Sequence, residues 1–219
     1  MNESFLKQVH FTGETQCEEF KPNPFKANIC VICCKEISKH KASSIRSQEI
    51  LMKALEYSQS FDKLGSVILP SNGESKTGGL YLGGYKSSMN KKFIVDNQIT
   101  HIVNAAKNLA SFFGPKYENT VKEIVRELKI EYLSLCWVDD EDFSIPVTDV
   151  MEAISFIHNG LTKGNVLVHC AQGKSRSSTV VIAYVMASKK LSLNDALKLV
   201  QEKRKMAQPN PGFMKFYHI

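Results

Sequence analysis

The chain has 219 residues, of which 43% are apolar, 12 are glycine and 7 are proline. This composition excludes a collagen-like chain and a wholly disordered one, and the length fits one domain plus a smaller extension. The net charge is +6, and all of the surplus follows residue 75: residues 1–75 hold nine basic and nine acidic side chains, whereas residues 76–219 hold 19 and 13. Such a balance can serve solubility alone, and it also suits an anionic substrate or partner.

The six cysteines are not spaced like a disulfide framework, and we expect a reducing compartment, the cytoplasm or the nucleus. The first residues lack the apolar core of a signal peptide, and neither end carries a lipidation motif. The longest apolar run, residues 180–187, is too short to cross a bilayer. We therefore expect no membrane partner.

The N-terminal region carries a possible metal site. Cys30 and Cys33 form a C-x-x-C pair, and His40 with Cys17 or His10 would complete four ligands for a tetrahedral structural zinc. The pattern resembles the small LIM-like or treble-cysteine knuckles of interaction proteins, and that likeness implies a docking module. A redox pair and reduced thiols remain the alternatives.

The next segment, residues 43–63, is rich in helix formers with roughly helical apolar spacing, and we expect a helix capped by Ser47. Residues 70–79 gather turn-forming and polar side chains, which favours a boundary there. We therefore divide the chain into an N-terminal extension, residues 1–75, and a second domain, residues 76–219.

After this boundary, short apolar runs alternate with segments of helical periodicity. The alternation favours an α/β fold whose central, mostly parallel sheet is flanked by helices. The expected strands are residues 80–82, 99–103, 132–135 and 166–168. The expected helices are residues 117–128, 147–158, 178–188 and 192–205.

The most informative segment runs from the strand at 166–168, through a tight loop with Gly173, into an apolar helix. Cys170 opens this loop and Arg176 closes it, so a thiol and a guanidinium flank one small concavity. The loop amides and the helix N-terminus favour an anion there, and Arg176 can bind two phosphate oxygens. The expected phosphate-binding residues are Ala171, Gln172, Gly173, Lys174, Ser175 and Arg176.

The same positive surroundings should lower the pKa of Cys170, which would make it a thiolate nucleophile at neutral pH. A buried cysteine after a strand is more often a small core residue, but the offsets of Gly173 and Arg176 argue against that reading here. We interpret the remaining cysteine of the domain, Cys136, as a core residue.

The loop, His169 to Ser177, resembles the His-Cys-x-x-Gly-x-x-Arg-Ser/Thr loop of the cysteine-dependent protein phosphatases, in its dual-specificity branch. The resemblance covers residues 77–219, including Pro209-Asn-Pro-Gly-Phe213 as the turn before the last helix. It implies a tyrosine-phosphatase-like fold. It also implies that His169 tunes the cysteine through hydrogen bonds and that the Ser177 hydroxyl stabilises the thiolate when it leaves.

Thiolate attack on a phosphate ester needs a proton donor for the leaving group, and the acidic run at residues 139–142 is the candidate cluster. The family's spacing from the strand residue Tyr132 selects Asp139. Alignment on the following helix selects Asp140 instead. We prefer Asp139 as the general acid and, in the second step, the general base.

The resemblance implies hydrolysis of phosphotyrosine and phosphoserine or phosphothreonine in proteins through a cysteinyl-phosphate intermediate. The expected partner is a phosphoprotein, with a MAP kinase as one candidate, and not a nucleic acid. No cofactor is needed for catalysis. Lys174, most simply a solvated lysine, keeps a phosphoinositide or RNA 5′-phosphatase open as the alternative, and a non-catalytic phosphoprotein-binding module is another.

Overall fold

The computed structural model describes residues 12–20, 30, 35–41, 64–74, 76–106 and 109–217. The chain divides into two compact units, Met1–Asp62 and Lys63–Ile219. The helix expected at residues 43–63 lies outside the described residues, as do His10 and Cys33. In the first unit the described regular element is a single-turn 3₁₀-helix, η1 (Ile37–Lys39).

In the described part of Lys63–Ile219, five strands form one sheet with the order β1-β2-β5-β3-β4. The neighbours β2-β5, β5-β3 and β3-β4 are parallel, and β1 runs antiparallel to β2. The strands are β1 (Gly65–Leu69), β2 (Leu80–Gly83), β3 (Ile99–Asn104), β4 (Glu131–Ser134) and β5 (Asn165–His169). The expected central, mostly parallel sheet is confirmed.

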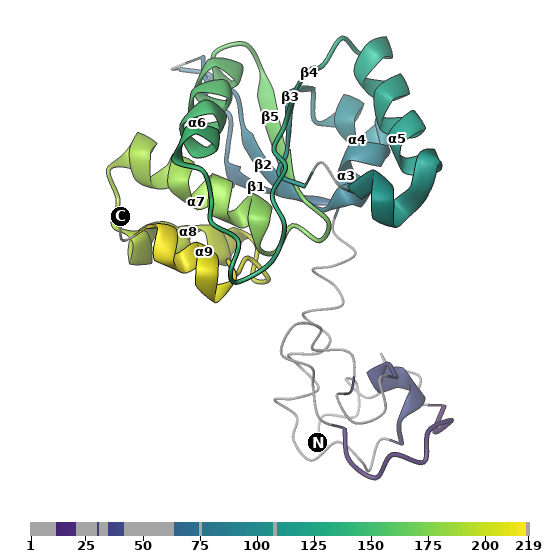
Figure 1. Ribbon diagram of the computed structural model, residues 1–219. Helices are drawn as coiled ribbons and strands as arrows, with labels where there is room; N and C mark the ends of the chain where they lie inside the picture. Colours follow the sequence, from purple (N-terminus) through teal and green to yellow (C-terminus); the bar gives the residue numbers. More distant parts are fainter. Residues whose placement is uncertain are drawn as a thin grey trace. The chain divides into compact units, whose positions relative to one another are not determined.

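Helices cover both faces of this sheet (Figure 1). On one side lie α3 (Tyr85–Met89), α4 (Lys91–Asp96) and α5 (Leu109–Glu127), and on the other α6 (Val147–Leu161), α7 (Arg176–Lys189), α8 (Leu193–Lys203) and α9 (Pro211–Phe216). No helix among the described residues combines the length and apolar character that a bilayer crossing requires.

The side chains of the central strand β5 alternate between the two faces of the sheet, and helices cover both faces. Leu167 belongs to the buried cluster that includes Ile94 of α4 and Ile124 of α5. Val166 and Val168 belong to the cluster that includes the apolar side chains of α7. This strand holds the following residue, Cys170, at the carboxyl edge of the sheet.

The structure adds elements that the sequence pattern did not predict, among them β1, α3 and α4. Because β1 pairs along β2, the compact units divide between Asp62 and Lys63, whereas we expected the boundary after residue 75. The helix expected from residue 117 begins earlier, at Leu109. Gly114 has φ of +74° and Pro115 follows it, so the chain breaks helical geometry just before the predicted start.

The interpretation of Cys136 as a core residue was wrong, because its side chain is exposed. It follows β4, where the extended chain alternates between buried and exposed positions. Leu135 and Trp137 point inward, at 3% and 0% exposure, so the residue between them faces solvent.

Candidate active site

The segment that joins β5 to α7 wraps around the side chain of Cys170. Cys170 directly follows β5, and Arg176 is the first residue of α7. Cys170 is 1% exposed. Its Sγ accepts hydrogen bonds from Ser177 Oγ, at 3.1 Å, and from the Gly173 N–H, at 3.3 Å. Both donors favour the thiolate over the thiol.

Five consecutive carbonyl oxygens of this loop accept hydrogen bonds from the framework around it. The donors are the Tyr85 N–H to Ala171 (3.0 Å), Arg204 Nη2 to Gln172 (2.9 Å), Arg204 Nε to Gly173 (2.9 Å), the Gln208 N–H to Lys174 (2.7 Å) and the Thr179 N–H to Ser175 (2.9 Å). In a trans peptide the C=O and the next N–H point in opposite directions. The N–H groups of residues 172–176 are therefore turned toward the inside of the loop, where they form an anion cradle at the N-terminus of α7.

Gly173 is required at its position for two reasons. Its φ is +71°, in the left-handed region that favours glycine. A Cβ there would also meet the carbonyl oxygen of Gly83 at 2.5 Å and Arg204 Nη2 at 2.6 Å. A larger residue would displace the N–H that faces Cys170.

The pKa of the Cys170 thiol lies below its ordinary value. Burial is the largest single influence and acts in the opposite direction. The positive charge of Arg176 and the hydrogen bonds from Ser177 and Gly173 together outweigh it. The expected thiolate nucleophile thus has a physical basis in three neighbouring groups.

We expect this pKa to be visible in the pH dependence of Cys170 alkylation by iodoacetate. The alkylation rate should rise with pH through the thiol pKa, with a midpoint below that of an ordinary cysteine. Ser177→Ala removes a hydrogen bond that favours the thiolate, so its midpoint should move to higher pH. Inorganic phosphate should protect both proteins. A midpoint unchanged by Ser177→Ala would contradict this role of the hydroxyl.

His169 is fully buried at the end of β5, and its environment favours the neutral ring. Burial chiefly lowers its pKa to about 4, although the hydrogen bond with the Cys170 carbonyl acts the other way. Its Nδ1 lies 3.3 Å from that carbonyl oxygen. The contact therefore reaches the backbone of Cys170 rather than its sulfur.

Asp139 and Arg176 meet at the mouth of the loop. Arg176 Nε lies 3.5 Å from Asp139 Oδ2, and Ser175 Oγ donates a hydrogen bond to Asp139 Oδ1 at 2.6 Å. By contrast, Asp140 Oδ1 accepts the Asp142 N–H at 2.8 Å, within its own turn. Of the two candidate acids, the structure thus places Asp139 against the loop.

Asn210, which sequence reasoning did not single out as a site residue, helps to hold this arrangement. Its Nδ2 donates to Asp139 Oδ1 at 3.0 Å, and its N–H donates to Ser175 Oγ at 3.2 Å. Its Oδ1 caps α9 by accepting the Phe213 N–H at 2.8 Å. The signal in the sequence was the turn Pro209-Asn-Pro, an N-cap followed by proline at the first helical position.

Trp137 also holds Arg176, through its backbone carbonyl. Its carbonyl oxygen accepts a hydrogen bond from Arg176 Nη1 at 3.3 Å. The indole is fully buried against Phe213, and its N–H donates to Asp149 Oδ2 at 2.9 Å. The contacts of Trp137 thus fix the segment two residues before Asp139.

Arg204 is the second site residue that the sequence did not reveal. It is 3% exposed and donates to the carbonyls of Gln172 and Gly173, as described above. Burial lowers its pKa to about 10, while the charge of Cys170 acts the other way. It follows α8, so tertiary packing rather than a local motif brings it to the loop.

Arg204→Met should therefore lower kcat/KM by about 10²-fold, because two loop carbonyls lose their donors and the amides inside the loop lose their fixed direction. Lys203→Met, an exposed neighbour at the end of α8, is the matched control and should keep wild-type activity. Steady-state kinetics together with thermal unfolding check this. Full activity in Arg204→Met would show that the loop holds its shape without Arg204.

Lys174 is not the solvated lysine that we expected. It is 9% exposed. Burial lowers the pKa of its ammonium group, whereas the charge of Asp139 raises it. Its backbone carbonyl belongs to the set that orients the loop, and its side chain lies within electrostatic reach of Asp139.

The expected metal ligands of the extension come together in part. One potential ligand atom from each of Cys17, Cys30 and His40 lies within 4.8 Å of the other two. Cys33 and His10 lie outside the described residues. This cluster belongs to the unit Met1–Asp62.

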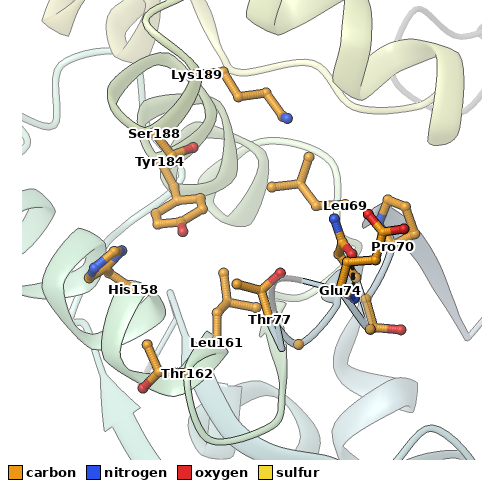
Figure 2. Close-up of a pocket in the computed structure, with 14 residues that line it drawn as sticks. Leu69, Pro70, Glu74, Thr77, His158, Leu161, Thr162, Tyr184, Ser188 and Lys189 are labelled. Carbon is orange, nitrogen blue, oxygen red and sulfur yellow. Dashed lines mark hydrogen bonds between the residues drawn. The ribbon is translucent and has the colours of Figure 1, made fainter.

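A pocket of about 860 Å³ lies elsewhere in the second unit (Figure 2). It is lined by β1, the turn after it, α6 and α7, with Thr77, Leu161 and Tyr184 among its residues. None of its lining residues belongs to the Cys170 loop, so it is separate from the candidate active site.

The sheet, the anion cradle and the buried Cys170 fit the catalytic domain of a protein phosphatase. The family model for "Dual specificity phosphatase, catalytic domain" matches residues 80–216, which is more than half of the chain. The chain therefore belongs to the dual-specificity phosphatase family, as the resemblance of the loop implied.

Similar proteins agree with this assignment. "MAP kinase phosphatase with leucine-rich repeats protein 3" of Dictyostelium discoideum is 32% identical over 186 residues, 83% of this chain and 19% of the relative. "Dual specificity protein phosphatase 1" of Arabidopsis thaliana is 36% identical over 138 residues, 63% of each protein. The crystal structure of DUSP15 matches with a TM-score of 0.51 and 31% identity, covering 70% of this chain and 84% of that one. The chain thus spans about a fifth of its Dictyostelium relative.

Proposed function

We propose that the chain dephosphorylates phosphotyrosine and phosphoserine or phosphothreonine in proteins through a cysteinyl-phosphate intermediate. The observation that carries this proposal is the convergence of three features on one loop. A thiolate-favouring Cys170, inward-turned amides and the pair of Arg176 with Asp139 all face the place where a phosphoryl group would bind.

In the first step the Cys170 thiolate attacks phosphorus. The P–S bond forms as the P–O bond to the substrate breaks, and Asp139 donates its proton to the departing oxygen. The loop amides and the Arg176 guanidinium stabilise the negative charge on the equatorial oxygens. Because these groups supply the positive charge, the proposed chemistry needs no metal or cofactor.

In the second step a water attacks phosphorus and transfers its proton to the Asp139 carboxylate. The P–S bond breaks, inorganic phosphate forms and Cys170 leaves as a thiolate. The Ser177 hydroxyl and the Gly173 N–H, at 3.1 and 3.3 Å from the sulfur, stabilise this leaving group. We assign His169 a positioning role, because it contacts the Cys170 backbone.

Asp139→Asn should lower kcat by about 10²- to 10⁴-fold on a phosphotyrosine peptide, because the leaving phenolate then receives no proton. The loss in phosphoryl-enzyme formation should be smaller with p-nitrophenyl phosphate, whose leaving group needs less help. Asp140→Asn is the matched control, since that carboxylate caps its own turn. Rapid-quench kinetics on the two substrates check this. Loss of activity in Asp140→Asn but not in Asp139→Asn would assign the acid to Asp140.

We propose a phosphoprotein as the partner, and the name of the Dictyostelium relative makes a phosphorylated MAP kinase a specific candidate. The test is a rate panel for the full chain, with Cys170→Ser as background. It compares phosphotyrosine and phosphoserine or phosphothreonine peptides with phosphoinositide vesicles and 5′-triphosphorylated RNA.

Phosphopeptides should be hydrolysed fastest. Faster turnover of inositides or RNA would replace the protein substrate by one of those. Binding of phosphopeptides without turnover would instead favour a binding module.

We place the protein in the cytoplasm or the nucleus. A thiolate nucleophile works only while it stays reduced, and these compartments keep thiols reduced. Fractionation of cells that express the tagged full chain checks this, and recovery in the secretory pathway would contradict it.

A further inference from the structure

The strongest feature outside the catalytic unit, Lys63–Ile219, is the cluster of Cys17, Cys30 and His40. Cys30 and His40 are both 0% exposed, and Cys17 is partly exposed. The two sulfur atoms lie 3.9 Å apart, and one atom of each of the three residues lies within 4.8 Å of the others. Three soft or borderline ligands therefore converge from three separate stretches of the chain.

This spacing fits tetrahedral coordination of zinc. With Zn–S bonds of about 2.3 Å, two thiolates on a tetrahedral centre lie about 3.8 Å apart. The observed 3.9 Å is close to that edge. A disulfide requires about 2.05 Å between the sulfur atoms, so the cluster has the dimensions of a metal site rather than of a bonded pair.

His40 is oriented as a metal ligand would be. Its Nδ1 lies 3.0 Å from the backbone carbonyl oxygen of Glu36. When a ring N–H donates to such a carbonyl, the other nitrogen carries the lone pair that binds the metal. Phe20, 1% exposed, packs edge-on against the imidazole with ring centroids 5.0 Å apart and further fixes the ring.

Two backbone hydrogen bonds bring the three stretches together. The Thr15 N–H donates to the Lys39 carbonyl at 3.1 Å, and the Cys30 N–H donates to the Lys35 carbonyl at 2.9 Å. The stretches that carry Cys17, Cys30 and His40 are thus joined through backbone hydrogen bonds as well as through the cluster.

We propose that Cys17, Cys30 and His40, through its Nε2, bind one structural Zn²⁺ in the N-terminal unit. These three residues are the ones that the described structure brings together. The site is independent of the catalytic chemistry proposed above.

The test measures the metal content of the purified chain, residues 1–219, by inductively coupled plasma mass spectrometry. We expect one zinc per chain in the wild type and loss of that zinc in Cys17→Ser, Cys30→Ser and His40→Ala. His40→Cys should retain it, because a thiolate can replace the imidazole. Cobalt exchanged into the wild type should give tetrahedral d–d bands with thiolate charge transfer.

Cys136→Ser and Cys170→Ser are the matched controls, since both lie in the catalytic unit, and both should keep one zinc. Hydrolysis of p-nitrophenyl phosphate, measured in parallel, reports on the catalytic unit separately, so loss of zinc and loss of activity are distinguishable. A wild-type chain that binds no stoichiometric zinc when zinc is supplied would overturn the proposal. So would a Cys17–Cys30 disulfide in the intact mass, or unchanged zinc in both Cys17→Ser and Cys30→Ser.

Discussion

Cys170→Ser is expected to reduce the hydrolysis of p-nitrophenyl phosphate by about 10⁴-fold or more, which corresponds to about 5 kcal/mol of lost transition-state stabilisation. A serine hydroxyl at this position stays protonated. The surroundings that lower the pKa of a thiol cannot lower the much higher pKa of an alcohol to near neutral pH. The Arg176 charge and the two hydrogen-bond donors would then act on a group that is a poor nucleophile.

The same variant should still bind phosphate. The loop amides and Arg176 remain, and replacing the thiolate removes a negative charge that repels the anion. Phosphate binding measured by calorimetry therefore separates a chemical defect from a folding defect. Cys136→Ser, at an exposed position, is the control and should keep wild-type activity. Wild-type activity no higher than that of Cys170→Ser would contradict the proposed function.

Arg176→Lys is expected to lower kcat/KM by about 10³- to 10⁵-fold, the range that a transition-state arginine contributes in phosphoryl transfer. Lysine keeps the positive charge but lacks the planar fork that binds two phosphate oxygens at once. In this chain Arg176 also has two structural contacts, at 3.3 Å to the Trp137 carbonyl and at 3.5 Å to Asp139. Lysine cannot reproduce both from one ammonium group.

The defect should appear in kcat as well as in KM, because the guanidinium follows the phosphoryl oxygens into the transition state. Arg126→Lys, on an exposed face of α5, is the matched control for the exchange itself. Thermal unfolding of both variants shows whether the fold is kept. A loss of less than about tenfold in a folded Arg176→Lys would show that charge alone is sufficient.

The geometry of the Cys170 loop could be predicted from the sequence because the residues that form it are local. Cys170, Gly173 and Arg176 are close in the chain, and the strand before them and the helix after them fix their relative directions. The alternation of short apolar runs with helical segments likewise predicted the parallel core of the sheet. Of its strands β2, β3 and β5 are mostly buried, whereas β4 is exposed to half-buried.

The supports of the loop could not be found in the same way. Arg204 and Asn210 reach it from the C-terminal segment, and Trp137 reaches it from the segment after β4. No local sequence pattern predicts that these residues contact the loop, because only tertiary packing brings these stretches together. Asp139 was predicted from the resemblance to the family. The sequence alone did not separate it from Asp140, whose carboxylate accepts a hydrogen bond within its own turn instead of contacting the loop.

The short edge strand β1 was not predicted from the sequence for a related reason. β1 is a five-residue antiparallel strand next to a turn-rich segment, and its pairing with β2 is what assigns it to the catalytic unit. Cys136 was misplaced because residue type outweighed position: a cysteine favours the core, but its neighbours Leu135 and Trp137 occupy the inward side.

The most direct test of the account is to trap the phosphorylated enzyme. Asp139→Asn with p-nitrophenyl phosphate is the best case, since the first step needs little acid whereas the second step lacks its base. Acid quenching followed by peptide mass spectrometry should find one phosphoryl group on Cys170, and none in the Cys170→Ser, Asp139→Asn double variant. Two results would contradict the cysteinyl-phosphate mechanism. One is an Asp139→Asn protein without a phosphoryl group on Cys170 although the wild type hydrolyses the substrate. The other is a phosphoryl group that persists in the double variant.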